Sequence, residues 1–216
     1  MGNIATISAD IIRSTSLERR DMEQLNMFLK DFLFKMEEQF EGFWGRIVRG
    51  DGVECVVENP KDVLRIAAIL KSWLRFYSLY SYKDPVPAFG VRISIGIGDM
   101  RIVDRKNGIL DGEAIYLSGR NLDKMGKRYR NSMVFSVAEE GKEKLLNTLA
   151  YLVNTIIAKD SPRQCEVIYY KMLGMNEEEL AERLHTSRSA VNQRSFGAGW
   201  SAIEKALDYF EHNIDL

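Results

Sequence analysis

Two aspartates, Asp10 and Asp51, stand where short apolar runs give way to small and polar residues. The first lies in residues 8–15 (SADIIRST), and the second lies in residues 49–52 (RGDG). Carboxylates at neighbouring strand ends can share a divalent cation, and the cation can hold a phosphate. The two segments therefore predict a site for Mg²⁺ or Mn²⁺ with Asp10 and Asp51 as ligands. The alternative is that Asp51 is only a turn residue and Asp10 caps a bend.

Hydrophobic periodicity predicts the elements that would position these aspartates. Residues 4–9 are predicted to form a strand, and a helix follows to about Phe40, starting at a capping box over residues 15–18. Residues 43–48 and 53–57 are two strand-like runs with the Asp-Gly pair between them, which is typical of a hairpin. The aspartates then lie on one edge of a sheet.

The next stretch predicts a second helix and strand, followed by shorter elements. A helix should follow the Asn59-Pro60 cap, and residues 89–97 alternate as in a half-buried strand. Residues 101–111 suggest a hairpin or loop, residues 113–128 a helix, and residues 132–136 a short strand. The element order favours an α+β fold: a ferredoxin-like βαββαβ core with helices on one face of an antiparallel sheet.

Three units are expected along the chain. Residues 1–137 form the sheet domain, residues 138–160 a connecting helix, and residues 161–216 a small all-α domain. Asp160-Ser161-Pro162 interrupts the helical pattern and marks the boundary. The connecting helix is expected to bury the apolar residues Leu145, Leu149, Leu152, Val153 and Ile156.

The last unit has the pattern of a helix-turn-helix. A helix starts at Ser161 and ends at Gly174, Asn176 caps a second helix, and Ser187 begins a third. In such a fold the exposed N-terminal residues of the third helix meet base edges. Asn and Gln can pair with adenine and Arg with guanine. The predicted DNA-reading residues are Ser187, Arg188, Ser189, Asn192, Gln193 and Arg194.

Charge and composition restrict the choice of partners. The net charge is −1, with 45% hydrophobic and 28% charged residues, as in a soluble globular protein. Residues 101–130 hold eight basic and four acidic side chains, a net charge of +4. Residues 161–216 hold six basic and nine acidic ones, a net charge of −3, so one copy should bind DNA weakly. A homodimer with two recognition helices would bind better, and a helical bundle that contacts protein is the alternative.

The cysteines and the N-terminal residues indicate the cellular compartment in which the protein is expected. Cys55 and Cys165 have no metal-type spacing and are expected to be buried thiols. The N-terminus lacks a basic region followed by a long apolar run, and no stretch approaches membrane-spanning length. A cytoplasmic protein with no membrane partner is expected.

Four segments resemble the catalytic domain of class III nucleotidyl cyclases: residues 9–15, 50–52, 92–98 and 112–120. Over its whole length the chain looks more like the SatD family of bacterial proteins, which is presumed to be DNA-binding or regulatory. Residues 179–191 (ELAERLHTSRSAV) closely resemble the helix-turn-helix of sigma-factor region 4 and of response-regulator output domains.

The cyclase resemblance implies that Asp10 and Asp51 hold the metals that bind a nucleoside triphosphate. The chain departs from that pattern at three positions. Tyr116 replaces an asparagine, although Arg120 matches an arginine, and Ile47 and Ile109 stand nearest to the purine-reading lysine and aspartate. Loss of a transition-state donor typically costs about 10²–10³ in rate. The resemblance therefore implies a binding site more than a working cyclase.

The sequence thus favours a transcriptional regulator whose cyclase-like domain senses a metal-linked nucleotide or phosphoester. A divergent metal-dependent nucleotidyl cyclase or nucleotidyltransferase is the second reading, and a protein–protein adaptor is the third. The predicted phosphate-binding residues are Ser14, Thr15, Arg120 and Lys124. The basic helical face that holds the last two could instead be merely solvated.

Overall fold

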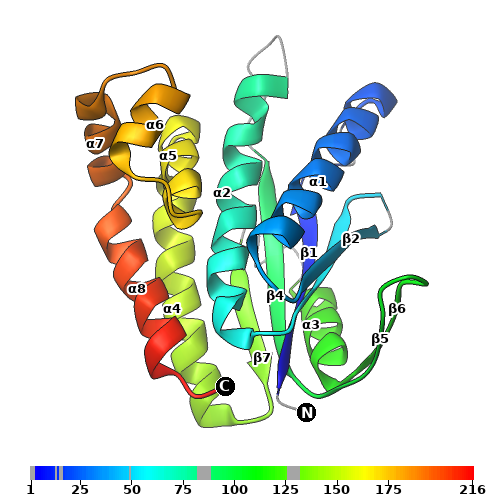
Figure 1. The fold of residues 1–216 in the computed structure, drawn as a ribbon. Helices are drawn as coiled ribbons and strands as arrows, with labels where there is room; N and C mark the ends of the chain where they lie inside the picture. Colours follow the sequence, from blue (N-terminus) through cyan, green and yellow to red (C-terminus); the bar gives the residue numbers. More distant parts are fainter. Residues whose placement is uncertain (1–2, 13, 15–16, 49, 82–88, 126–131) are drawn as a thin grey trace.

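A five-stranded mixed sheet forms the centre of the computed structural model, which describes residues 3–12, 14, 17–48, 50–81, 89–125 and 132–216 (Figure 1). The central strand β1 (Ile4–Ile12) pairs antiparallel with β3 (Gly52–Val57) on one side and β4 (Gly90–Gly98) on the other. At one edge, β2 (Phe43–Val48) pairs antiparallel with β3. At the other edge, β7 (Met133–Val137) pairs parallel with β4.

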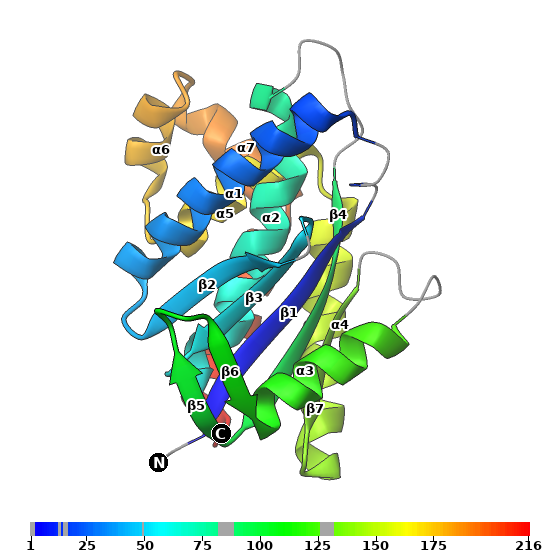
Figure 2. The ribbon, with the colours of Figure 1, turned by 90° about the vertical axis from the view of Figure 1, so that its right-hand side faces the viewer.

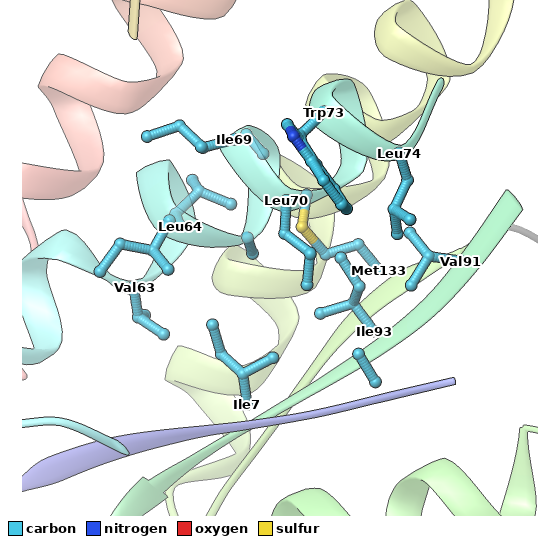
Figure 3. Close-up of a cluster of buried hydrophobic side chains, with 14 of the residues drawn as sticks. Ile7, Val63, Leu64, Ile69, Leu70, Trp73, Leu74, Val91, Ile93 and Met133 are labelled. Atoms are coloured by element: carbon cyan, nitrogen blue, oxygen red, sulfur yellow. The ribbon is translucent and has the colours of Figure 1, made fainter. Parts of the chain in front are cut away.

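The two helices of the βαββαβ core cover one face of this sheet. These are α1 (Arg19–Gln39) and α2 (Val63–Ser81), the second entered through a 3-10 turn over Pro60–Asp62. Figure 3 shows Ile7 of β1 and Ile93 of β4 beneath the apolar side chains of α2. The predicted α+β class and the placement of both core helices on one face are confirmed. The predicted antiparallel pairing is found among β2, β3, β1 and β4. The complete sheet is mixed because β7 pairs parallel with β4.

The opposite face carries α3 (Glu113–Lys124) and a hairpin of β5 (Met100–Asp104) and β6 (Ile109–Gly112) (Figure 2). The hairpin was one of the two predicted forms of this segment. Close approach of α3 to β4 requires a glycine at Gly96, where an added Cβ would lie 2.7 Å from the backbone nitrogen of Ser118. The sequence pattern alone did not predict this second layer.

Polar side chains help to join α3 to the central strands. The hydroxyl of Ser118 lies 2.9 Å from the hydroxyls of both Thr6 and Ser8. Asn121 donates to the hydroxyl of Ser94 at 3.2 Å. All three serines and Thr6 are buried, so each needs such a partner. The even-numbered face of β1 is therefore polar, and it leads directly to Asp10.

Three C-terminal helices extend the main core. They are α4 (Glu140–Lys159), α5 (Pro162–Met172) and α8 (Trp200–Asn213), and their buried side chains belong to the same apolar cluster as the sheet. Two short helices, α6 (Glu177–Arg183) and α7 (Arg188–Gly197), lie beyond α5 in Figure 1. The apolar core continues across the predicted domain boundary, and the three-unit division stays a prediction.

A buried polar junction lies where α2 meets the α4–α5 corner. Arg75 donates from Nη2 to the backbone oxygen of Asp160 at 2.7 Å, and Asp160 itself is buried. Burial raises the pKa of Asp160 to about 7. Burial, together with the Arg75 guanidinium, lowers the pKa of the fully buried Lys71 to about 7. Burying ionisable groups costs free energy, so this junction lowers the stability of the core.

Most helix boundaries agree with the predicted caps. The side chains of Asn59, Ser161, Asn176 and Ser187 all accept backbone N–H groups at helix starts. The helix α1 begins at Arg19, with Glu18 at its N-cap position and no side-chain cap from that residue. The predicted box at residues 15–18 depends on Thr15 and is therefore not tested. Residues 15 and 16 lie outside the described part of the chain, as do residues 126–131 at the expected end of α3.

The predicted inner face of α4 is offset by one residue. The helix buries Leu146, Ala150, Val153, Asn154 and Ile157. Leu145 and Leu152, expected inside, are 42% and 52% exposed, and Leu149 and Ile156 are half-buried. Both neighbouring stripes of this helix are apolar, so the period alone could not select between them.

Both cysteines are free and buried, as expected, and burial raises the pKa of each thiol. Within the described residues, no helix is long and apolar enough to cross a membrane.

Candidate functional site

The two predicted metal ligands face one cleft on the α3 side of the sheet. Asp10 lies inside β1, not at its end, and pairs in register with Gly52 of β3 and Arg92 of β4. Asp51 occupies the turn between β2 and β3, and its backbone oxygen accepts from the amide of Ile11 at 3.2 Å. The strand is longer than predicted because Ile11 and Ile12 continue the pairing with β4. The antiparallel register nevertheless brings Asp10 and Asp51 together.

The cleft has a volume of about 370 Å³ and is mainly acidic. Besides Asp10 and Asp51, it is lined by Glu54 of β3 and Asp123 of α3. Among the described residues of the lining, Arg92 is the one basic side chain. Such an excess of carboxylates over cations favours binding of a cation.

Each predicted metal ligand already has a polar partner. Arg92 forms an ion pair with the carboxylate of Asp10. The buried hydroxyl of Ser14 donates to Oδ2 of Asp51 at 2.5 Å. Glu54 pairs with Arg46 at 2.5 Å. These contacts orient the carboxylates, since hydrogen bonds to charged acceptors are the stronger ones.

The donor set fits Mg²⁺ or Mn²⁺ only when a ligand supplies further oxygens. Among the described residues, no cluster of three or more His, Cys, Asp or Glu side chains is close enough to hold a metal ion. Magnesium is usually bound by one or two carboxylates together with water and substrate phosphates. Asp10 and Asp51 match that arrangement, with Arg92 placed to contact an anionic oxygen of the same ligand.

The predicted phosphate-binding residues are not all brought to this cleft. Ser14 lies beside Asp51, but Arg120 is exposed and its guanidinium lies 5.3 Å from the ring centre of Tyr116. Lys124 lines a different cavity, between α3, β7 and α4. Thr15 lies outside the described residues. Their role in binding a phosphate stays a prediction.

The residues that stand in place of the cyclase asparagine and of the base-reading groups are not part of the cleft lining. Tyr116 is exposed and donates its hydroxyl to Asp111 on β6. Ile109 is exposed on the same hairpin, and Ile47 of β2 pairs in register with Val53. None of the three is among the residues that line the cleft.

Sequence reasoning missed three residues of the cleft: Arg92, Glu54 and Asp123. Arg92 opens the segment that resembles the cyclases, and its alternation with Ser94 was the available signal. Its pairing with Asp10 depends on the register between β1 and β4, which the sequence does not state. Asp123 reaches the cleft only because α3 crosses the second face of the sheet.

The second candidate site is the α6–α7 unit, which has its own small core. Val167 of α5, Leu180 of α6 and Val191 of α7 form a buried cluster separate from the main one. The turn between α6 and α7 includes His185 in the left-handed region, with φ of 47°. The two helices and their turn thus match the predicted helix-turn-helix segment.

One face of α7 presents the predicted DNA-reading residues. Ser187, Arg188, Ser189, Asn192 and Gln193 are exposed, whereas Arg194 is half-buried. The hydroxyl of Ser187 is already used, since it accepts the amide of Ala190 at 3.1 Å as the helix cap.

Two features of this face were not predicted. Phe196 is 87% exposed and lies one turn beyond Asn192 and Gln193. Glu177, in the first turn of α6, accepts from Nδ2 of Asn192 at 3.5 Å and lies 3.9 Å from Nε of Arg188. The carboxylate therefore neutralises part of the face that would meet DNA.

Comparisons with known proteins add a distant likeness of fold. No protein-family model and no curated protein matches the chain. Among solved structures it is similar to the active GGEEF domain of a diguanylate cyclase from Vibrio cholerae, at 12% identity and a TM-score of 0.46. The alignment covers 64% of this chain and 85% of that one. Membership of the SatD family stays a prediction.

Proposed function

We propose that the protein is a DNA-binding transcriptional regulator whose sheet domain senses a metal-linked nucleotide or related phosphoester. The observation that carries the proposal is the face of α7. Polar side chains able to read bases lie exposed there, on a helix held from behind by Val191 and Ser195.

The acidic cleft supports the sensing half of the proposal. Two carboxylates and one arginine in a cleft of about 370 Å³ suit a cation bridged to phosphate oxygens. The resemblance to the SatD family, on the segments given above, supports the pairing of such a domain with a DNA-binding one.

A homodimer would bind DNA more tightly than one copy, in spite of the acidic charge of the helical region. Exposed apolar side chains on α4 offer a surface for a second copy: Leu145, Tyr151 and Leu152 are 42%, 67% and 52% exposed. Two recognition helices double the contacts to phosphates and bases, and affinity for DNA depends steeply on the number of phosphates contacted.

DNA binding is tested by fluorescence anisotropy with labelled genomic fragments at two salt concentrations. Arg188→Ala combined with Gln193→Ala should weaken binding by about tenfold or more, since each base contact contributes about 1–3 kcal/mol. Lys205→Ala, an exposed cation on α8, is the control for charge. Binding that the double variant leaves unchanged would show that α7 is not the reader.

Ligand sensing is tested by thermal shift with nucleotides, with and without Mg²⁺. A ligand that binds only the folded state raises the melting temperature. Asp10→Asn and Asp51→Asn should each abolish the Mg²⁺-dependent part of the shift. A shift that persists in both variants would move the ligand away from this cleft.

A divergent nucleotidyl cyclase or nucleotidyltransferase is the second candidate, favoured by the shared cleft of Asp10 and Asp51. Incubation with the four nucleoside triphosphates and Mn²⁺, followed by chromatography, tests it directly. A cyclic or linear product that disappears in Asp51→Asn would establish the enzyme. Without any product, the sensor remains the better reading.

A protein–protein adaptor is the third candidate, favoured by Phe196. An aromatic side chain on α7 that is 87% exposed suits a protein partner as well as a thymine methyl group. Fluorescence anisotropy of Phe196→Ala distinguishes a DNA contact from a protein contact. The substitution should weaken DNA binding only if Phe196 contacts a base.

A further inference from the structure

The most exposed large apolar side chain among the described residues lies on α7, at the outer edge of the molecule (Figure 1). Phe196 is 87% exposed, and Tyr151 follows at 67%. A single exposed ring is ordinary on a protein surface, so exposure alone assigns no partner. The place of Phe196 on the helix, its support and its neighbours decide what it can contact.

Phe196 lies on the same side of α7 as the predicted base-reading residues. Residues three or four positions apart share a face of a helix, so Phe196 stands one turn beyond Asn192 and Gln193. Val191 and Ser195 are buried on the opposite side. The exposed residues of the helix are Arg188, Ser189, Asn192, Gln193, Phe196 and Gly197. The ring is therefore part of the face that would meet DNA.

The backbone that carries Phe196 is held on both sides. Ser195 and Ala198 are buried, and the amide of Ala198 donates to the backbone oxygen of Arg194 at 2.9 Å. A Cβ added at Gly197 would lie 2.8 Å from Nε2 of Gln164, so this end of α7 lies close to the start of α5. A contact made by the ring therefore orders only its own side chain, which keeps the entropy cost of binding small.

The neighbours of Phe196 indicate which base edge it would meet. Asn and Gln pair with adenine through N6 and N7, and the thymine of the same base pair presents its C5-methyl group in the major groove. Phenylalanine is one of the side chains that contact this methyl group. One helical turn is about 5.4 Å, or between one and two base-pair steps of about 3.4 Å. A helix that places Asn192 or Gln193 on an adenine can thus bring Phe196 to a thymine methyl group one or two steps away.

We propose that Phe196 is a specificity-determining residue that contacts the C5-methyl group of a thymine, beside adenine contacts made by Asn192 and Gln193. This inference rests on the proposed DNA-binding function and extends it, because it assigns a sequence feature to the target. The preferred site then contains adjoining A·T pairs. The contact to bases also reaches the C-terminal half of α7, beyond its first turn.

The test uses uracil, which pairs as thymine does and lacks the methyl group. A pool of duplexes with a randomised centre is first enriched for binding to the whole chain. The enriched duplex is then prepared with thymine or with uracil, and fluorescence anisotropy compares the two forms. The wild type should bind the thymine form about fourfold more tightly, because a methyl group leaves water on contact with the ring. Replacing thymines one at a time should place this loss at one base pair for each copy of α7 bound.

Variants assign the preference to the ring. Phe196→Ala should bind the thymine and uracil forms equally, whereas Phe196→Leu keeps an apolar side chain and should retain a preference. Tyr209→Ala removes another exposed aromatic side chain, on α8, and should keep the full preference. Each comparison is between two DNAs bound by the same variant, so a change in protein stability cannot imitate the result.

The outcomes separate this inference from the proposed function. Equal affinity of the wild type for both forms, or a thymine preference that Phe196→Ala keeps, would overturn the role of Phe196 and leave DNA binding in place. If no duplex is enriched, α7 does not bind DNA, and the proposed function fails together with this inference.

Discussion

The acidic cleft and the α7 face differ in how the chain builds them. The cleft draws its charged side chains from β1, β3, β4, the β2–β3 turn and α3, which are far apart in sequence. The α7 face comes from a single ten-residue helix. Its side chains are placed by helix periodicity alone, whereas those of the cleft depend on strand register and on helix docking. The residues of a site built by one element can therefore all be named from the sequence, whereas a site built by five is named only in part, here as Asp10 and Asp51.

The two regions also differ in the core that supports them. The cleft rests on the main apolar cluster, which spans the sheet and the five helices α1, α2, α4, α5 and α8. The α6–α7 unit rests on three buried residues, Val167, Leu180 and Val191. We expect the second region to open locally without loss of the first, because few buried contacts hold it.

The largest effect is expected at Gly96, which allows α3 to reach the sheet. Gly96→Val should destabilise the protein by about 3 kcal/mol or more, because its side chain has to displace the α3 backbone. Urea unfolding measures the change. Gly141→Ala is the control, since a Cβ there meets nothing within 4 Å. Similar stabilities of the two variants would show that α3 does not pack closely.

Leu180→Ala should have the next largest effect on stability. It should destabilise α6 and α7 by about 2–4 kcal/mol and leave the rest of the fold intact. Hydrogen exchange should rise in these two helices while β1 and β4 keep their protection. Leu29→Ala, in the main core, is the comparison and should raise exchange throughout. Global unfolding of Leu180→Ala would instead join the two regions into one cooperative unit.

The third prediction concerns the pH dependence of stability that Asp160 causes at the junction of α2, α4 and α5. Its folded pKa is raised to about 7, so the folded state holds a proton that the unfolded state releases above about pH 4. The stability from this group is therefore present at low pH and is lost as the pH rises from about 4 to 7. Asp160→Asn should remove this trend, and its stability relative to the wild type should increase over that window by up to about 4 kcal/mol.

Urea unfolding between pH 4 and pH 8 measures this difference, and Asp215→Asn, at an exposed position, is the control. Lys71 contributes in another window. Its folded pKa is lowered to about 7, so its cost is relieved only as the pH rises from about 7 to 10.5. A difference between Asp160→Asn and the wild type that is constant from pH 4 to pH 7 would contradict a buried, protonated Asp160.

The smallest effect concerns the charge on the α7 face. Glu177→Gln should increase affinity for DNA about threefold to tenfold, because it removes a negative charge beside Arg188 and Asn192. Fluorescence anisotropy measures it, with Glu178→Gln as the matched control in the same helical turn. An equal gain from both variants would mean that only net charge matters, and not the contact with α7.

The sequence predicted most elements because their signals are local. Caps at Asn59, Ser161, Asn176 and Ser187 fixed the starts of helices, and the alternation at 89–97 gave β4. The prediction failed where two solutions have the same local pattern. The inner stripe of α4 was one residue out.

By itself, the sequence determined the βαββαβ order, the hairpin turn at Asp51 and the polar face of α7, since each depends on residues close together in the chain. The tertiary structure decided that Arg92 pairs with Asp10, that α3 covers the second face, and that aromatics of α2 and α5 pack against one another. Those contacts join residues distant in sequence, and only strand register and helix packing bring them together.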